Sequence, residues 1–394
     1  MSQRGSPESP ALVGRVVLWG TCDTGKPRVR ILRDGLRAQG IEVIECRVDV
    51  WNGIQDKSQV GAGQWIGLLA RIVLAYPALI WRYLRLPSHD WVLLGYPSIP
   101  DVFVIRLFAW FRGARLAMDW FLCAYDTVVQ DRRLVGRRHP LSMLLWGTEW
   151  LAIRAADAVF MDTRAHAERM ERLFGLPKGR CGSVWVGAEH EVFANGQGDS
   201  RPVPPRHDCL QVLFYGQFIP LHGVPTIVEA ARLLRDQAVE WLIVGRGQES
   251  KRIRSMLDAD PLPRLRWLEW VEYERLVEHI AEADVCLGIF GTSDKASSVI
   301  PNKVFQVIAA GRPIVTRDSP GVRELLMHRP PCSYLIPAND PNALAGAIRA
   351  HATLQSEAPA TRCHAELAPH VDAAAIGGQL KAMLASYSHR ETAR

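Results

Sequence analysis

The sequence predicts an α/β protein with two Rossmann-like, doubly wound domains that face each other across a cleft. The chain has 394 residues, 48% of them apolar and 22% charged, which is the composition of a globular protein long enough for two domains. In both halves, short apolar runs alternate with amphipathic helical patterns, which is the arrangement of parallel βαβ units. A segment rich in proline and glycine separates the halves, as a domain linker would.

The first half of the chain opens with a βαβ unit. Its first strand is expected over 13–19, and the helix that follows turns Val29 and Leu32 inward. Further strands are expected over 41–47, 91–96, 114–118 and 158–161. Residues 1–12 lack the apolar run of a signal peptide and are expected to be a disordered lead. The N-terminal domain is therefore expected over 13–198.

The second half repeats the same rhythm after a linker expected over 199–207. Strands are expected over 212–215, 240–244, 266–268, 285–288 and 313–316. Helices are expected over 224–234, 249–257 and 301–310. This C-terminal domain is expected over 208–394, with its ligand bound beyond the carboxyl ends of the strands.

Eight cysteines are scattered through the chain without any C-x-x-C spacing. They are Cys22, Cys46, Cys123, Cys181, Cys209, Cys286, Cys332 and Cys363. This spacing argues against a disulfide framework and against a zinc site, and it favours a reducing cytoplasm. No metal and no cofactor are expected.

All of the net charge of +6 lies in residues 1–205, because basic and acidic residues balance over 206–394. Residues 65–138 alone hold ten Arg against five acidic residues, interleaved with Trp, Phe and Leu. Such a surface inserts apolar groups into an anionic bilayer while Arg meets the head groups. We therefore expect a peripheral protein on the cytoplasmic face of a membrane, unless the aromatic residues are simply core and the Arg a solvated rim. No nucleic-acid partner is expected, since no RNA-binding signature appears.

The most apolar stretch, 65–86, does not predict a membrane-spanning helix. Its uncharged interior, 72–81, is ten residues long and contains Pro77, whereas a span needs about 20 residues. This stretch is expected to lie on a membrane and not to cross it.

The loop over 20–27 nearly has the P-loop pattern of phosphate-binding proteins. Pro27 stands where that pattern has Ser or Thr, which removes a hydroxyl for Mg²⁺ and a backbone N–H for phosphate. An ATPase or kinase is the weaker interpretation, and a loop that borders the cleft is preferred. The acceptor-side residues expected from this loop are Thr21, Gly25, Lys26 and Arg28.

Two segments of the second half favour an anionic ligand. Residues 244–249 join a strand to a helix, and their two glycines let a ligand approach the backbone, although the third glycine of a dinucleotide site is missing. Pro301 begins a helix, so the N–H groups of Asn302 and Lys303 lack intrahelical partners and the helix dipole favours an anion there. The alternative is an ordinary capped helix.

Asp119 and Asp126 follow a predicted strand and are expected to point toward the cleft. Either carboxylate would position the hydroxyl of an acceptor. Lys303 is expected to be the catalytic cation beside the leaving anion.

Four segments of the second half form a recognisable series. They are YGQFIPLHGVPTIVEAARLL (215–234), LIVGRGQES (242–250), LRWLEWVEYERLVEHIAEADVCLG (265–288) and VIPNKVFQVIAAGRPIVTRDSPGVRELL (299–326). In this order and spacing they resemble the nucleotide-sugar-binding blocks of glycosyltransferase family 4, and SVWVGAEHEVF (183–193) resembles the segment that closes its N-terminal domain. The resemblance implies the GT-B fold, a nucleotide-sugar donor held by the C-terminal domain, transfer with retention at the anomeric carbon, and no obligatory metal.

The same resemblance implies a set of donor-binding residues. The diphosphate would lie near Gly216, Gln217 and His222, with Gly245, Arg246 and Gly247 beside it. The base would lie among Glu269, Trp270 and Val271. The sugar, phosphate and ribose would contact Gly291, Lys295, Ser298, Asn302, Lys303 and Gln306.

Two pairs of positions depart from the family pattern. Gln217 and His222 stand where the family commonly has Arg and Lys, and Ser298 and Gln306 stand where it has paired glutamates. Gln still bonds ribose hydroxyls, but Ser does not replace a carboxylate. The expected function is hexosyl transfer to a hydroxyl of a lipid-linked glycan or glycolipid by a divergent subgroup. The alternative is a catalytically impaired nucleotide-sugar-binding protein of the same fold.

Overall fold

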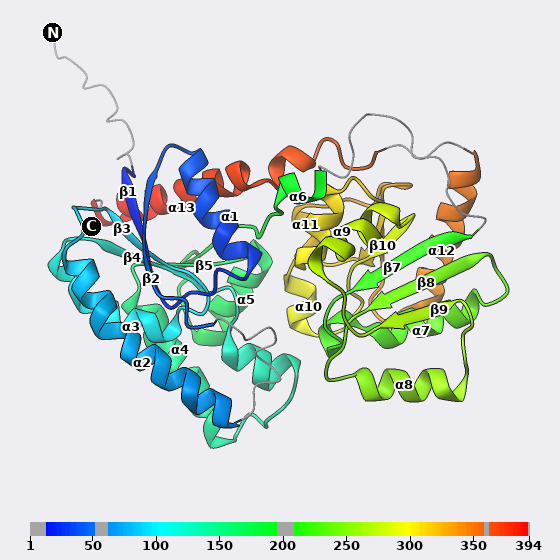
Figure 1. Ribbon diagram of the computed structural model, residues 1–394, viewed down its shortest axis with the longest axis horizontal. Helices are drawn as coiled ribbons and strands as arrows, with labels where there is room; N and C mark the ends of the chain where they lie inside the picture. Colours follow the sequence, from blue (N-terminus) through cyan, green and yellow to red (C-terminus); the bar gives the residue numbers. More distant parts are fainter. Residues whose placement is uncertain (1–12, 52–61, 195–208, 358–361, 393–394) are drawn as a thin grey trace, which may run out of the picture.

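The chain folds into two α/β domains, each built on a six-stranded sheet (Figure 1). The computed structural model describes residues 13–51, 62–194, 209–357 and 362–392. The predicted lead, 1–12, and the predicted linker, 199–207, lie outside the described residues. The predicted fold class is confirmed, because every pairing within the two sheets is parallel.

The N-terminal sheet has the strand order β2-β1-β3-β4-β5-β6. Its strands are β1 (Arg15–Gly20), β2 (Glu42–Arg47), β3 (Trp91–Leu94), β4 (Arg115–Asp119), β5 (Ala158–Met161) and β6 (Cys181–Ser183). One face of the sheet packs against α1 (Pro27–Ala38). The other face packs against α2 (Ala62–Leu84), α3 (Ile99–Phe111), α4 (Pro140–Ala155) and α5 (Arg164–Phe174).

The C-terminal sheet has the order β12-β11-β10-β7-β8-β9. Its strands are β7 (Leu210–Tyr215), β8 (Val239–Val244), β9 (Leu265–Leu268), β10 (Val285–Leu287), β11 (Ile314–Arg317) and β12 (Ser333–Ile336). One face is covered by α7 (Val224–Leu233), α8 (Ser250–Ala259) and α12 (Pro341–Glu357). The other face is covered by α9 (Tyr273–Glu282) and α11 (Asn302–Ala309).

Each sheet reverses its strand order at one strand, and these points position the site. In the N-terminal sheet the reversal is at β1, which lies between β2 and β3, and in the C-terminal sheet it is at β7, which lies between β8 and β10. Open α/β sheets bind their ligands at the carboxyl ends of such strands. The loops after β1 and β7 are therefore the first places to look for a site.

The last helix, α13 (Ala373–Thr392), returns to the N-terminal domain and packs along α1 (Figure 1). Gly35 of α1 and Gly377 of α13 meet so closely that a Cβ on either would collide with the other helix. Ile376 and Leu380 are buried in the N-terminal core. The predicted end of the C-terminal domain is therefore wrong, because the apolar stripe of α13 fits the other domain's core.

The cysteine spacing argued against a disulfide framework, but the structure contains one disulfide. Cys332 and Cys363 form a disulfide with their Cα atoms 5.2 Å apart. They are 31 residues apart in the sequence, and the fold, not a local spacing, brings them together. The other six cysteines are free in the described part of the chain.

Helix α2 is 23 residues long and continues through Pro77, well beyond the uncharged interior over 72–81. Its window Gly67–Leu84 has a mean hydropathy of 1.3 and is long and apolar enough to cross a membrane by length and composition. Leu68, Ile72 and Leu79 nevertheless pack in the N-terminal core. The length of the helix therefore does not exclude a membrane span, contrary to the expectation. The packing of one side of the helix in the N-terminal core is what argues against a span.

Candidate active site between the two domains

A cavity of about 690 Å³ lies between the domains, at the carboxyl ends of β1, β7 and β8. Its N-terminal wall includes Asp23, Gly25, Lys26, Arg30, Asp49 and Trp51. Its C-terminal wall includes Tyr215, Gly216, Gln217, Gly245, Arg246, Glu269, Trp270, Val271 and Tyr273. The structure thus brings the acceptor-side residues Gly25 and Lys26 opposite the expected donor-side loops.

Two glycines let the backbone form the C-terminal wall. Gly216 and Gly245 have φ angles of 138° and 140°, a region that favours glycine. A Cβ on Gly245 would collide with the carbonyl oxygen of Gly216. The loops after β7 and β8 therefore approach each other closely, and both glycines line the cavity.

Lys303 and His222 lie directly behind Gly216. A Cβ on Gly216 would lie 3.1 Å from Lys303 Nζ and 2.9 Å from His222 Cε1. Lys303 Nζ donates a 3.3 Å hydrogen bond to the Gly288 carbonyl oxygen and lies 3.9 Å from the centre of the Phe214 ring. Burial lowers the pKa of Lys303 well below its usual range, and burial together with the Lys303 charge lowers the pKa of His222. An anion bound at Gly216 would raise both pKa values.

Gln217 contacts the N-terminal domain through Arg132. The Arg132 guanidinium donates a 3.2 Å hydrogen bond to Gln217 Oε1, and the Gln248 amide donates a 3.2 Å bond to the Arg132 carbonyl oxygen. Arg132 therefore brings a positive charge next to Gln217, whose own side chain is neutral. The sequence did not single out this residue, because it lies 85 positions away in the chain.

Gln306 reaches the cavity wall through Tyr215. The Tyr215 hydroxyl donates a 3.0 Å hydrogen bond to Gln306 Oε1, and Tyr215 itself lines the cavity. The sequence did not lead us to expect Tyr215 at the site. Its position as the last residue of β7, next to Gly216, could have indicated it, because ligands bind at the carboxyl ends of such strands.

Several residues expected at the donor lie outside this wall. The Ser298 hydroxyl donates 3.0 Å hydrogen bonds to the carbonyl oxygens of Asp294 and Lys295 within α10 (Asp294–Ser298). Gly291 is packed so tightly that a Cβ would collide with the backbone of the 220–221 turn. Asn302 begins α11 and Gly247 donates a 2.8 Å bond to Ser250 Oγ, and neither residue lines the cavity.

On the acceptor side, three expected residues point into the N-terminal domain. Thr21 is buried and donates through its N–H and hydroxyl to Asp101, at 2.8 and 3.0 Å. Arg28 and Asp119 form a buried ion pair with a 2.8 Å contact. The expected contacts of Thr21, Arg28 and Asp119 with an acceptor are therefore not available, since each polar group is already bonded inside the core.

Asp126 and Lys295 join the two domains and do not line the cavity. Asp126 is buried and accepts a 2.5 Å hydrogen bond from Arg169, and its other oxygen lies 3.7 Å from Lys295 Nζ. Lys295, from the C-terminal domain, also donates a 2.6 Å bond to the Thr127 hydroxyl. Burial raises the pKa of Asp126, but the bond from Arg169 and the charge of Lys295 outweigh it and lower that pKa. The expected role of Asp126 at an acceptor is thus replaced by an ionic contact between domains.

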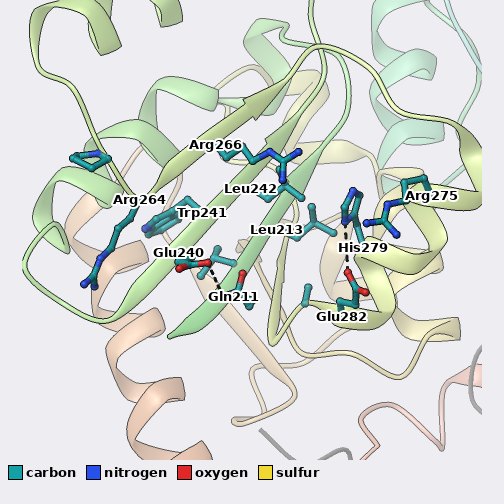
Figure 2. A pocket seen from close by; sticks show the side chains of 13 residues that line it. Gln211, Leu213, Glu240, Trp241, Leu242, Arg264, Arg266, Arg275, His279 and Glu282 are labelled. Atoms are coloured by element: carbon teal, nitrogen blue, oxygen red, sulfur yellow. Dashed lines mark hydrogen bonds and ion pairs between the residues drawn. The ribbon is translucent and has the colours of Figure 1, made fainter. Parts of the chain in front are cut away.

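A second hollow, of about 430 Å³, lies on the C-terminal sheet (Figure 2). It is lined by residues of β7, β8, β9 and α9, among them Gln211, Glu240, Arg266 and His279. Gln211 donates a 3.0 Å hydrogen bond to Glu240, and His279 lies 3.8 Å from Glu282. This hollow sits over the amino-terminal halves of β7 and β8, away from the carboxyl ends of these strands, where such sheets bind their ligands. The interdomain cavity is therefore the candidate active site.

The C-terminal domain matches a known protein family. Residues 210–353 match the family model described as "Glycosyl transferases group 1". This stretch contains the whole C-terminal wall of the cavity. The predicted resemblance to glycosyltransferases is confirmed, and the assignment to family 4 in particular stays a prediction.

Two curated relatives carry similar sequences. The chain is 27% identical over 309 residues to the chitobiosyldiphosphodolichol beta-mannosyltransferase of Eremothecium gossypii, which covers 68% of this chain and 62% of that protein. It is 25% identical over 223 residues to the putative colanic acid biosynthesis glycosyltransferase WcaL of Escherichia coli, which covers 55% and 51%. The matched part thus spans less than two thirds of either relative.

Solved structures share the fold over nearly the whole chain. The Anabaena protein Alr3699/HepE in complex with UDP-glucose has a TM-score of 0.61 at 14% identity, covering 95% of this chain and 99% of that one. The sucrose-phosphate synthase of Thermosynechococcus elongatus has a TM-score of 0.61 at 16% identity, covering 95% and 94%. The predicted GT-B fold is confirmed by these likenesses.

Proposed function

We propose that this protein transfers a hexosyl group from a nucleoside diphosphate sugar to a hydroxyl of a lipid-linked glycan or glycolipid. The observation that carries the proposal is the interdomain cavity, where bare glycine backbone backed by Lys303 faces a wall with Asp23 and Lys26. Two names support the ligand classes. One relative is named for a dolichol-linked acceptor, and the HepE structure is titled as a UDP-glucose complex.

The donor diphosphate is proposed to bind at the loops after β7 and β8. Gly216 and Gly245 let its oxygens approach the backbone, and Lys303 and Arg132 supply positive charge from either side. The base is proposed to lie at 269–271, and the ribose at Gln306. Tyr215 holds the Gln306 amide with its carbonyl oxygen toward the hydroxyl, so the amide nitrogen is left to donate to the ribose.

The proposed chemistry breaks the bond between the anomeric carbon and the diphosphate oxygen, and the diphosphate leaves with the electron pair. The acceptor oxygen forms the new bond to that carbon, and its proton passes to the leaving diphosphate. Preorganised N–H groups and cations stabilise the leaving anion most in the transition state. Retention and independence of metal are proposed from the resemblance to family 4. The anomeric configuration of the product, determined by NMR, and activity in the presence of a chelator test these two points.

Asp23 is proposed to orient the acceptor hydroxyl, in place of Asp119 and Asp126. It is a buried carboxylate on the cavity wall, held by a 2.9 Å hydrogen bond from the Gly25 N–H. An Asp23→Asn variant should lose turnover while its thermal stabilisation by the donor nucleotide stays unchanged. Loss of both properties would instead assign Asp23 to the donor side.

The reaction is proposed to take place on the cytoplasmic face of a membrane, with residues 65–138 toward the bilayer. A lipid-linked acceptor stays in the bilayer. An enzyme with its cavity next to that surface meets the acceptor without extracting it.

The test has two steps. A thermal-shift panel of UDP, GDP, ADP and their sugar conjugates should give stabilisation by one nucleotide family, because a ligand that binds only the folded state raises its stability. The matching nucleotide sugar should then release nucleoside diphosphate faster when lipid-linked acceptors are added. Stabilisation without any release would favour the impaired nucleotide-sugar-binding protein, in line with Ser298 and Gln306. No stabilisation by any nucleotide would contradict both.

A further inference from the structure

The exposed apolar side chains of the molecule are concentrated on one side of the N-terminal domain. Of the 19 large apolar side chains that are exposed in the described part of the chain, 14 lie between Leu69 and Leu151. They lie on α2, α3 and α4, with Leu134 just before α4. We name this set the apolar face. Its most exposed members on the three helices are Leu74, Phe111 and Met143, at 77%, 69% and 68%.

The apolar face is one surface and not three separate stripes. Helices α2, α3 and α4 pack against the same face of the N-terminal sheet, with Leu79, Ile105 and Ile153 in a common core. α2 contacts α3 and α3 contacts α4, and the three lie together on the side of the sheet opposite α1 and α13 (Figure 1). The outward sides of neighbouring helices therefore join.

The charge of this surface has one sign. The three helices contain two acidic residues, Asp101 and Glu149, and both are fully buried. Arg71, Arg82 and Arg154 are exposed on α2 and α4. The outward surface of these helices thus presents apolar side chains and cations, with no carboxylate.

Two arginines lie over tryptophans of α2 and α4. The guanidinium of Arg85 lies 3.7 Å from the centre of the Trp81 ring, and that of Arg154 lies 3.7 Å from the centre of the Trp150 ring. Such pairs have an apolar body and a charged tip, which suits the boundary between acyl chains and head groups.

We propose that the apolar face inserts into one leaflet of a bilayer that contains anionic lipid. Soluble monomers rarely expose one contiguous apolar patch of more than a few hundred Å², so this surface needs an occupant. A second copy bound through the same face would set Arg against Arg without any carboxylate between them. Anionic head groups supply the missing negative charge.

The contact is monotopic, because α2 lies on the membrane without crossing it. Leu68, Ile72, Ala75, Leu79 and Tyr83 recur at helical spacing and are buried in the N-terminal core. A spanning α2 would pull all of them out of that core. The proposal also extends the expected membrane region beyond residue 138, since α4 contributes to the face.

This inference deepens the proposed function by naming the surface of α2, α3 and α4 that enters the bilayer and the class of lipid that it recognises. The inference rests on the proposed function in one respect only, namely that the acceptor is lipid-linked and reaches the cavity from the bilayer. Membrane binding is measured without donor or acceptor, so the two proposals fail separately.

The experiment is vesicle flotation of the full chain with phosphatidylcholine alone and with added phosphatidylglycerol. The wild type should float with the anionic vesicles. The partition coefficient of a triple variant, Leu74→Asp with Phe111→Asp and Met143→Asp, should fall by about tenfold or more. Each change removes apolar surface that would enter the bilayer and adds a negative charge that anionic lipid repels. Met327→Asp is the matched control, since Met327 is 75% exposed in the C-terminal domain, and its partition should equal that of the wild type.

Three results would overturn the proposal. In the first, the wild type does not bind anionic vesicles. In the second, the triple variant floats like the wild type. In the third, the wild type is a dimer and the triple variant is a monomer. The third result would assign the face to a second copy. A cooperative thermal unfolding transition of the triple variant, close to the wild-type temperature and measured without ligand, shows that the variant is folded.

Discussion

The helices that cover the two sheets have the same structural task but present different surfaces to solvent. In the N-terminal domain, α2, α3 and α4 carry most of the large exposed apolar side chains, whereas α7, α8, α9, α11 and α12 of the C-terminal domain expose only Leu233 and Leu354 among the described residues. Both sets bury an apolar stripe against their sheet. Folding therefore explains the inner sides of all these helices, and the outer side of the N-terminal set requires a different cause.

Helix α2 allows the sharpest test of this difference, because it carries both surfaces. Leu79→Ala removes a fully buried side chain and should cost about 2–5 kcal/mol of unfolding free energy. Leu74→Ala, on the outer side, should change stability by less than about 0.5 kcal/mol and weaken vesicle binding. Chemical denaturation of both variants measures the contrast. Equal costs would mean that the outer side also supports the fold.

Lys303 lies in the C-terminal domain, whose helices expose few large apolar side chains. Lys303→Ala should lower turnover by about 10² to 10³-fold, since it removes one preorganised cation from the leaving diphosphate. Lys251→Ala is the matched control, because Lys251 is exposed on α8 of the same domain, and its turnover should stay at the wild-type value. Steady-state kinetics with the donor found by thermal shift provide the measurement. Undiminished turnover of Lys303→Ala would remove the phosphate assignment.

The smallest expected effect is a proton linkage at the same residue. Burial lowers the pKa of free Lys303, and a bound diphosphate would raise it again. Donor binding should therefore take up protons. The affinity for the donor should fall by up to about tenfold per pH unit as the pH rises above the pKa that Lys303 has in the free protein. Titration calorimetry in buffers of different ionisation enthalpy detects this uptake. Lys303→Met should abolish it, and a wild type without buffer dependence would contradict the assignment.

The sequence predicted the parts of the molecule that depend on local pattern. Ten of the twelve strands in the described part of the chain follow apolar runs that predicted them, whereas the edge strands β6 and β12 were not predicted. The loops after β7 and β8 follow from Gly216 and Gly245, whose φ angles few other residues adopt. The opposition of Lys26 to these loops follows from strand order. Each of these features is set within a few residues of chain.

The missed features depend on partners that are distant in the chain. Asp119 was expected at the cleft, but Arg28, 91 positions away, binds it in the core. Lys295 meets Asp126 only when the domains come together, and Cys363 meets Cys332 through the fold. The position of α13 depends on the close contact of Gly35 with Gly377. No periodicity encodes such pairs, since each depends on which surfaces finally meet.

The interdomain cavity is proposed to hold a nucleotide sugar. A crystal structure with the nucleotide that stabilises the protein most tests this proposal directly. We expect diphosphate oxygens against the backbone of Gly216 and Gly245, within hydrogen-bonding distance of Lys303 Nζ, and the base at 269–271. A nucleotide bound instead in the hollow lined by Gln211 and His279 (Figure 2) would contradict it.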